Sequence, residues 1–199
     1  MTDHIYAHEH PESDRKRDGG FTLWFTGLSG SGKTTIAHLV GPELECRGHV
    51  VEYLDGDVVR THLSKGLGFS KEDRDTNIER IGWVASRLTR HGAAVLVSAI
   101  SPYEETRRNA RGLIEEHGDF VEVFVKASVD VCASRDVKGL YEKAFSGEIK
   151  EFTGVSDPYE EPSAPELVLD TESQSPEESA ASVLEVLTAR GLTGERVGV

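Results

Sequence analysis

Short runs of apolar and β-branched residues recur along the chain, separated by segments in which apolar positions follow helical spacing. The runs have the length of buried strands, which we expect at residues 21–26, 49–54, 93–98, 120–126 and 166–170. Helices are expected at residues 35–46, 58–60, 70–90, 103–117, 129–136 and 176–190. Strands that alternate with helices predict a three-layer α/β fold, in which a five-stranded parallel sheet lies between helices.

One domain is predicted over residues 21–190, because a chain of 199 residues can bury one substantial core. Residues 1–20 are polar and are expected to form a flexible tail, and residues 191–199 are expected to fray. Residues 137–165 are rich in Gly, Pro, Tyr and charge, with little core-forming pattern. A loop this long inside a compact domain is usually functional, so we predict a lid at about 137–165.

Acidic residues outnumber basic ones by 35 to 22, which gives a formal net charge of −13. This balance argues against nucleic acid as a partner, because a phosphate backbone requires a basic face. An anionic small substrate would need a local cluster of Arg and Lys that works against the overall field.

The chain has no apolar run of transmembrane length, and its amino-terminal segment has no apolar signal core. We therefore expect no membrane partner and a cytoplasmic protein. Cys46 and Cys132 are too few for a disulfide framework, and both fall in expected helices. They are predicted to be reduced, buried thiols.

The most informative stretch is the first strand with the loop and helix that follow it. Gly27, Gly32, Lys33 and Thr34 fit the pattern G-x-x-x-x-G-K-[ST] in the required strand–loop–helix context. Glycines let backbone amides approach a polyphosphate, Lys33 would reach its β- and γ-phosphates, and the Thr34 hydroxyl would bind Mg²⁺. A P-loop fold that binds ATP and Mg²⁺ is predicted, rather than a chance glycine-rich turn. The phosphate-binding residues are Gly27, Leu28, Ser29, Gly30, Ser31, Gly32, Lys33, Thr34 and Thr35.

Polar residues gather after the other strands, where parallel sheets bind ligands. Two acids, Asp55 and Asp57, end the second strand, and the third ends at Ser98. Further polar residues share helix faces in pairs: Asp57 with Arg60, Arg74 with Asn77, and Arg107 with Arg111. One basic residue, Lys138, begins the long loop. Each alone could be a solvated surface charge, but together they predict a site for a second small anion. The chain has no Asn-Lys-x-Asp motif of a guanine-nucleotide switch.

From these residues outward, the chain resembles the adenylylsulfate kinase family over about residues 21–169. That family uses ATP to phosphorylate the 3′-hydroxyl of adenosine 5′-phosphosulfate. The matching pieces are FTGLSGSGKT at 25–34, LDGD at 54–57 with Arg60, LGFS at 67–70, EDR at 72–74, NI at 77–78 with Arg80, AISPY at 99–103, RD at 135–136, KGLY at 138–141, GEI at 147–149, FTG at 152–154, PYE at 158–160 and PE at 165–166.

The resemblance implies roles for individual residues. Those expected to hold the adenylylsulfate are Arg60, Phe69, Arg74, Asn77, Ile100 and Lys138. Asp57 would take or orient the 3′-hydroxyl proton, Asp55 would lie near the metal through water, and Arg135 would contact the nucleotide. Ser101 matches a serine treated in the family as a phosphorylated intermediate. Direct in-line transfer needs no such intermediate, so we weigh a ligand-contact or structural role for Ser101 above a covalent one.

The family pattern also implies a homodimer, and a separate ATP sulfurylase to supply the acceptor. Glu104 stands where the family usually has Arg, and Phe145 replaces a more usual basic residue. Two alternatives to an adenylylsulfate kinase remain at this point. One is a P-loop kinase of another small hydroxylated metabolite, and the other is a non-catalytic nucleotide-binding regulatory subunit.

Overall fold

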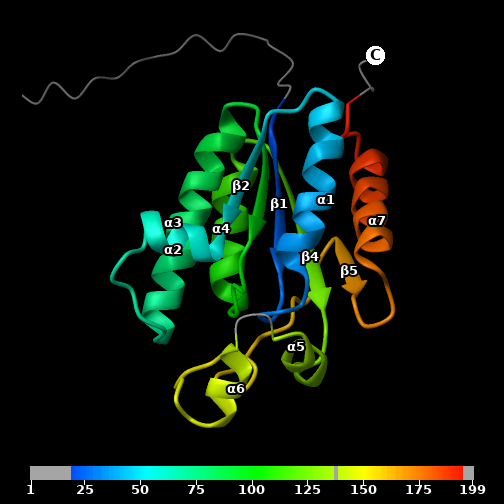
Figure 1. Cartoon of the computed structure of the whole chain (residues 1–199). Helices are drawn as coiled ribbons and strands as arrows, with labels where there is room; N and C mark the ends of the chain where they lie inside the picture. Colours follow the sequence, from blue (N-terminus) through cyan, green and yellow to red (C-terminus); the bar gives the residue numbers. More distant parts are fainter. Residues whose placement is uncertain (1–18, 137–138, 195–199) are drawn as a thin grey trace, which may run out of the picture.

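The computed structural model describes residues 19–136 and 139–194, and its centre is a five-stranded parallel sheet (Figure 1). The strands are β1 (Phe21–Thr26), β2 (Val51–Asp55), β3 (Ala94–Ser98), β4 (Asp119–Lys126) and β5 (Leu167–Asp170). Their order is β2-β3-β1-β4-β5, with every neighbouring pair parallel. The predicted α/β fold with a five-stranded parallel sheet is confirmed.

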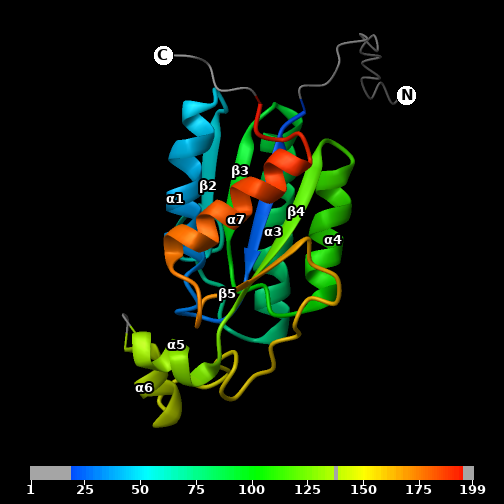
Figure 2. The ribbon, with the colours of Figure 1, turned by 90° about the vertical axis from the view of Figure 1, so that its right-hand side faces the viewer.

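Helices cover both faces of the sheet (Figure 2). They are α1 (Lys33–Cys46), α2 (Gly56–His62), α3 (Lys71–Arg90), α4 (Glu104–Glu115), α5 (Val129–Arg135), α6 (Leu140–Phe145) and α7 (Pro176–Ala189). Apolar residues of α1 and α7 pack on one face, and those of α3 and α4 pack on the other. The sequence pattern did not predict α6, which lies inside the expected lid.

The central strand β1 contributes to both cores. Phe21, Leu23 and Phe25 face α1 and α7, whereas Trp24 faces α3 and α4. All six residues of β1 are buried, which explains why this strand is a run of apolar and β-branched residues rather than an alternation of apolar and charged ones.

The strand order reverses at β1, because β2 and β3 lie on one side of it and β4 and β5 on the other. In open parallel sheets, ligands bind beyond the carboxyl ends of the strands at such a switch point. The loop after β1 opens there, and α5 and α6 lie beyond the strand tips (Figure 1). In the part of the chain that the structure describes, no helix is long and apolar enough to cross a membrane.

The structure corrects three expectations about burial, two near the ends of the domain and one at a cysteine. Gly20, assigned to the tail, is buried, and its carbonyl accepts from the Asp119 amide. Thr193, assigned to a frayed end, is only 4% exposed. Cys132 is buried as predicted, but Cys46 is exposed because it lies on the outward face of α1; both thiols are free. Residues 1–18 and 195–199 lie outside the described residues.

Candidate active site

The loop between β1 and α1 depends on glycines for its path. Gly27 has a φ of +147°, and a Cβ there would lie 2.3 Å from the carbonyl oxygen of Val125. Gly30 and Gly32 also have positive φ, at +78° and +105°. Side chains are strained in this region of φ, so the glycines allow the tight turn that a polyphosphate cradle requires.

Lys33 begins α1 and folds its side chain back across this loop. Its ammonium donates hydrogen bonds to the carbonyl oxygens of Gly27 at 2.8 Å and Leu28 at 2.7 Å. The N-cap residue Gly32 supplies no side-chain acceptor, and the first turn of α1 holds no acidic residue. The amides and the positive dipole end of α1 therefore favour an anion in the loop. The other residues predicted to bind phosphate lie in the same loop or in the first turn of α1: Ser29, Gly30, Ser31, Thr34 and Thr35.

The two residues predicted to bind metal lie side by side. Thr34 Oγ1 donates a hydrogen bond to Asp55 Oδ2 at 2.7 Å. Asp55 is also the N-cap of α2, where its Oδ1 accepts from the Asp57 amide at 2.9 Å. Residues 19–136 and 139–194 contain no group of three or more His, Cys, Asp or Glu that could hold a metal. A Mg²⁺ ion bound by one or two side-chain oxygens together with phosphates needs no such group, so this pair fits Mg²⁺.

Three residues predicted to hold the acceptor, Arg60, Phe69 and Arg74, form one cluster. The Arg60 guanidinium lies 4.8 Å from the centre of the Phe69 ring, and that of Arg74 lies 5.8 Å from it. The Phe69 side chain remains 54% exposed. Burial, followed by the positive charge of Arg74, lowers the pKa of Arg60. Two cations beside an exposed ring suit an anion that carries an aromatic base.

Arg74 connects this cluster to the lid segment, by which we mean residues 139–165. The Arg74 side chain is buried, and its Nε donates to the Phe69 carbonyl oxygen at 2.7 Å. Its two terminal nitrogens donate to the Glu151 carbonyl and the Thr153 hydroxyl, and Nη2 lies 3.4 Å from the Asp157 carboxylate. An anionic substrate at Arg74 would therefore compete with a carboxylate of the protein.

Asn77 lies one turn beyond Arg74 on α3 and is only 4% exposed. Its Oδ1 has no hydrogen-bond partner. Buried polar atoms almost always have one, so this oxygen is available to accept a hydrogen bond from a ligand. Of the other two residues predicted to hold the acceptor, Ile100 is half-buried on the loop after β3, and Lys138 lies outside the described residues.

Ser101 lies in a buried hydrogen-bond network beneath the strand ends. Its side chain is 1% exposed, and its Oγ accepts from Trp24 Nε1 at 3.1 Å and donates to Thr26 Oγ1 at 3.0 Å. Thr26 in turn donates to the Ile100 carbonyl at 2.7 Å. Because the protein itself occupies the hydrogen bonds of this enclosed hydroxyl, the geometry favours a structural role for Ser101 over a covalent one.

Arg135 ends α5 beside the phosphate loop. Its Nη1 lies 3.4 Å from the Gly30 carbonyl oxygen and 3.2 Å from Thr171 Oγ1. Thr171 donates to the Ser31 carbonyl at 3.0 Å. The structure therefore places Arg135 next to the loop whose nucleotide it is predicted to contact.

The structure does not support Arg107 and Arg111 as anion-binding residues. Arg107 Nε donates to the Glu122 carboxylate at 2.9 Å, and only 2% of the Arg107 side chain is exposed. Arg111 pairs with both oxygens of Glu166, at 2.8 and 2.9 Å. Both cations form closer ion pairs than Arg74 does, with carboxylates that lie far away in the sequence, so the structure gives no support for either as part of a second anion site.

The lid segment has more internal order than its composition predicted. The Asp136 carboxylate accepts from the amides that begin α6, including that of Tyr141 at 3.0 Å. Tyr141 is buried and donates to the Ser29 carbonyl of the phosphate loop at 2.9 Å. Burial, reinforced by Cys132, raises the pKa of Tyr141. Sequence reasoning missed Tyr141 and Tyr159 as anchors, although aromatic residues in a polar loop were a usable signal.

The two departures from the family pattern lie in different surroundings. Glu104 begins α4, and its carboxylate accepts from the Ser163 hydroxyl of the lid segment. Phe145 ends α6 and is 59% exposed. The first departure therefore contacts the lid segment, and the second faces solvent.

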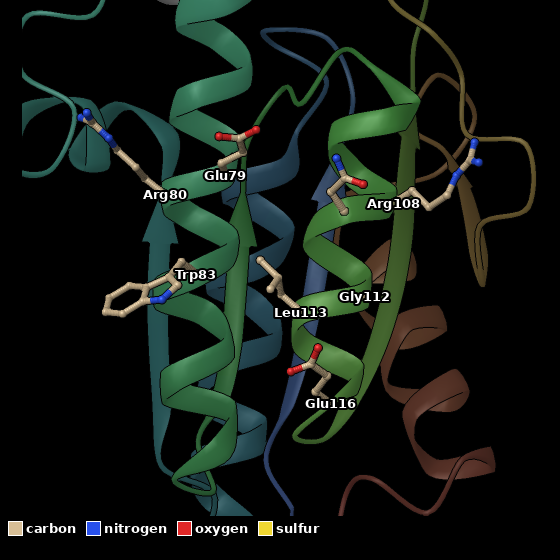
Figure 3. Close-up of a pocket in the computed structure, with 8 residues that line it drawn as sticks. Glu79, Arg80, Trp83, Arg108, Gly112, Leu113 and Glu116 are labelled. Carbon is tan, nitrogen blue, oxygen red and sulfur yellow. The ribbon is translucent and has the colours of Figure 1, made fainter. Parts of the chain in front are cut away.

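A separate groove lies on the outer surface between α3 and α4 (Figure 3). Leu113 points from α4 toward α3, and Trp83 is 59% exposed. Charges of both signs line the groove, among them Glu79 and Arg80. It lacks the excess of positive charge that an anionic substrate needs, so the candidate site remains the group of residues at the strand ends.

Residues 19–170 match the family described as adenylylsulphate kinase. The chain belongs to this family. An adenylyl-sulfate kinase from Rippkaea orientalis is 56% identical over 180 residues, which is 90% of this chain and 98% of the relative. One from Microcystis aeruginosa is 57% identical over 180 residues, which again is 90% of this chain and 98% of the relative. A solved structure of the Mycobacterium tuberculosis APS kinase CysC in complex with AMPPNP and APS matches with a TM-score of 0.82. It is 45% identical, and the match covers 85% of this chain and 98% of that one.

Membership of the adenylylsulphate kinase family confirms the resemblance inferred from the sequence. The match covers every described residue predicted to bind ATP or the acceptor, from Gly27 to Arg135. The geometry adds two facts that the sequence could not supply. Thr34 and Asp55 are in contact, and Asn77 carries an unpaired buried oxygen.

Proposed function

We propose that this chain is an ATP-dependent adenylyl-sulfate kinase. It transfers the γ-phosphate of ATP to the 3′-hydroxyl of adenosine 5′-phosphosulfate, giving 3′-phosphoadenylylsulfate and ADP. The observation that carries this proposal is the cluster of Arg60, Phe69 and Arg74, with the buried Asn77 oxygen one turn away. A phosphate loop alone is common to many kinases, whereas this cluster suits an adenosine compound with a charged 5′ group.

On the donor side, the loop amides and Lys33 hold the phosphates of ATP. The positive φ at Gly27, Gly30 and Gly32 and the open amino end of α1 support this assignment. The Lys33 side chain lies across the loop, and its ammonium would exchange carbonyl partners for phosphate oxygens. Arg135 lies at the outer side of the same loop.

Thr34 and Asp55 would hold Mg²⁺, because their hydroxyl and carboxylate oxygens are ligands that this ion prefers. The bound ion would neutralise charge on the β- and γ-phosphates. Asp55 can contribute without losing its position, since its other carboxylate oxygen accepts from the Asp57 amide.

On the acceptor side, Arg60 and Arg74 bind the phosphosulfate oxygens through their planar guanidinium groups. The Phe69 ring stacks on adenine, and Asn77 accepts a hydrogen bond from the substrate. Ile100, on the loop after β3, is half-buried and belongs to the same proposed set. Lys138 belongs to this set as well.

Asp57 orients the 3′-hydroxyl and accepts its proton. It lies in the first turn of α2, two residues after the proposed metal residue Asp55. Phosphoryl transfer proceeds through a loose transition state, so positioning and charge neutralisation by Lys33 contribute more than a strong base would. The lid segment excludes water from the transferred group.

Other parts of the proposal concern the surroundings of the enzyme. We propose a cytoplasmic homodimer that receives its acceptor from a separate ATP sulfurylase and serves sulfate activation. Family membership supports the reaction class, while size measurement in solution will test the dimer. Ser101 is proposed as a structural residue of the loop after β3.

The deciding experiment is a coupled assay of ADP release with adenosine 5′-phosphosulfate, gluconate or a nucleoside offered side by side. We expect turnover with adenosine 5′-phosphosulfate to exceed that with every other alcohol. Preferred turnover of another acceptor would show a kinase of a different metabolite. ATP binding without ADP release on any acceptor would show a regulatory nucleotide-binding protein.

A further inference from the structure

Arg107 is a buried cation whose three hydrogen-bond partners come from three separate parts of the chain. Its Nε donates to the Glu122 carboxylate on β4 at 2.9 Å. Nη1 donates to the carbonyl oxygen of Ser101 at 2.7 Å, and Nη2 donates to that of Glu160 at 2.8 Å. One planar group on α4 therefore joins the sheet, the loop after β3 and the lid segment.

The loop after β3 needs such support, because Ser101 has a φ of +42°. A residue other than glycine in this region is strained, by on the order of 1–3 kcal/mol, and stays there only when its surroundings hold it. Trp24 and Thr26 hold its hydroxyl, and Arg107 holds its carbonyl. This conformation fixes the backbone of Ile100, which belongs to the proposed acceptor site.

Glu160 is attached to the same loop by two further hydrogen bonds. Its amide donates to the Pro102 carbonyl at 2.8 Å, and its carboxylate accepts from the Glu104 amide at 2.7 Å. The preceding residue, Tyr159, shares a 2.9 Å hydrogen bond with Thr26, which directly precedes the phosphate loop. The lid segment is therefore anchored where the donor and acceptor halves of the crevice meet.

We propose that Arg107 is a positioning residue of the kinase. By holding the carbonyls of Ser101 and Glu160 at once, it fixes the loop after β3 and the lid segment relative to each other. Glu122 fixes the plane of the guanidinium, and its charge compensates the buried cation. Lysine cannot replace this group, since it has no rigid fork with which to reach three acceptors. The inference rests on the proposed function only for the identity of the acceptor.

The test compares Arg107→Lys with Arg111→Lys. Arg111 lies one turn further along α4 and also contacts Glu122, but it has no hydrogen bond to Ser101 or Glu160. Hydrogen exchange followed by mass spectrometry reports on the backbone of residues 99–104 and 157–163. In Arg107→Lys we expect exchange there to accelerate about tenfold, as the loss of a charge-assisted hydrogen bond implies. Exchange in β1 should not change.

Kinetics give a second readout that simple destabilisation would not mimic. Arg107→Lys should lower kcat/KM for the acceptor by roughly ten- to hundredfold through misplacement of the loop after β3. Its KM for ATP should stay near that of the wild type, and ADP release without acceptor should rise because water enters the crevice. Arg111→Lys should show neither change.

Equal exchange in the two lysine variants, or an unchanged kcat/KM for the acceptor in Arg107→Lys, would overturn the proposal. If Arg107→Lys does not fold, Glu122→Gln decides the question, because it keeps the arginine and the shape of its partner. Unchanged exchange at Glu160 in that variant would likewise overturn the proposal. Hydrogen exchange is measured without substrate, so it does not depend on the identity of the acceptor. If adenosine 5′-phosphosulfate is not the acceptor, the wild-type protein will show no turnover with it.

Discussion

The Thr34 hydroxyl donates a 2.7 Å hydrogen bond to the carboxylate of Asp55, although 21 positions separate the two residues in the chain. The parallel sheet produces this contact, since β1 and β2 both end at the edge where the phosphate loop begins. Mg²⁺ bound to ATP would therefore meet a hydroxyl from α1 and a carboxylate from the N-cap of α2.

Replacement of Asp55 by Asn should weaken the use of Mg²⁺ while leaving the fold intact. The amide is nearly the same size and can still cap α2, but it carries no charge. We expect the Mg²⁺ concentration for half-maximal turnover to rise by roughly ten- to hundredfold. Titration of turnover with Mg²⁺ at fixed ATP measures the change.

Asp119→Asn is the matched control, because Asp119 is exposed at the opposite end of the sheet. Its Mg²⁺ dependence should equal that of the wild type. If Asp55→Asn behaves like this control, Asp55 acts only as a helix cap.

Ser101→Ala should retain turnover within a few-fold of the wild type. The change removes the acceptor of the Trp24 indole N–H, which should lower the free energy of unfolding by about 1–3 kcal/mol. Denaturant unfolding measures that loss, and intact mass after incubation of the wild type with ATP should show no phosphorylated protein. A well-folded Ser101→Ala without turnover would instead support a phosphoserine intermediate.

The sequence predicted the fold well where local signals and the fold agree. The strand–loop–helix pattern around Gly27 and the apolar run of β1 correctly indicated a buried strand before a phosphate loop. The helix predicted over residues 70–90 does begin there: Ser70 is the N-cap of α3, and its hydroxyl accepts from the Asp73 amide at 3.2 Å. These features depend on neighbours within a few residues.

Contacts between distant segments could not be predicted in the same way. Helical spacing placed Arg107 and Arg111 on one face, but only the packed structure reveals Glu122 and Glu166 as their partners. The burial of Tyr141 likewise depends on α5 and the phosphate loop, not on its own segment. Composition alone therefore made the lid segment look less ordered than it is.

Asp57→Ala should remove most of the turnover and leave ATP binding nearly intact. Asp57 lies in the first turn of α2, two residues beyond the proposed metal residue Asp55 and three before Arg60 of the proposed acceptor site. Loss of a proton-accepting group typically slows turnover by about 10²–10⁴-fold. Calorimetric titration with a non-hydrolysable ATP analogue measures the binding, and a coupled assay measures the turnover. A collapse of ATP affinity would make Asp57 a nucleotide or metal residue instead.

Glu166 should make the folded state sensitive to acid. Burial alone would raise its pKa, but the hydrogen bonds and charge of Arg111 and the Glu122 amide outweigh burial and hold the pKa below its ordinary value of 4.5. The carboxylate therefore contributes stability above about pH 4.5, and this contribution disappears as the pH falls through the lowered pKa. Glu166→Gln should cost about 2 kcal/mol of unfolding free energy at neutral pH and progressively less as the pH falls below 4.5. Urea unfolding from pH 3 to 7 measures the difference.

Glu115→Gln is the control, because Glu115 lies 3.3 Å from the same arginine but is exposed. Its effect on the free energy of unfolding should stay within about 0.5 kcal/mol. A loss in Glu166→Gln that did not shrink toward low pH would mean that the lost packing, and not the charge of Glu166, provides the stability.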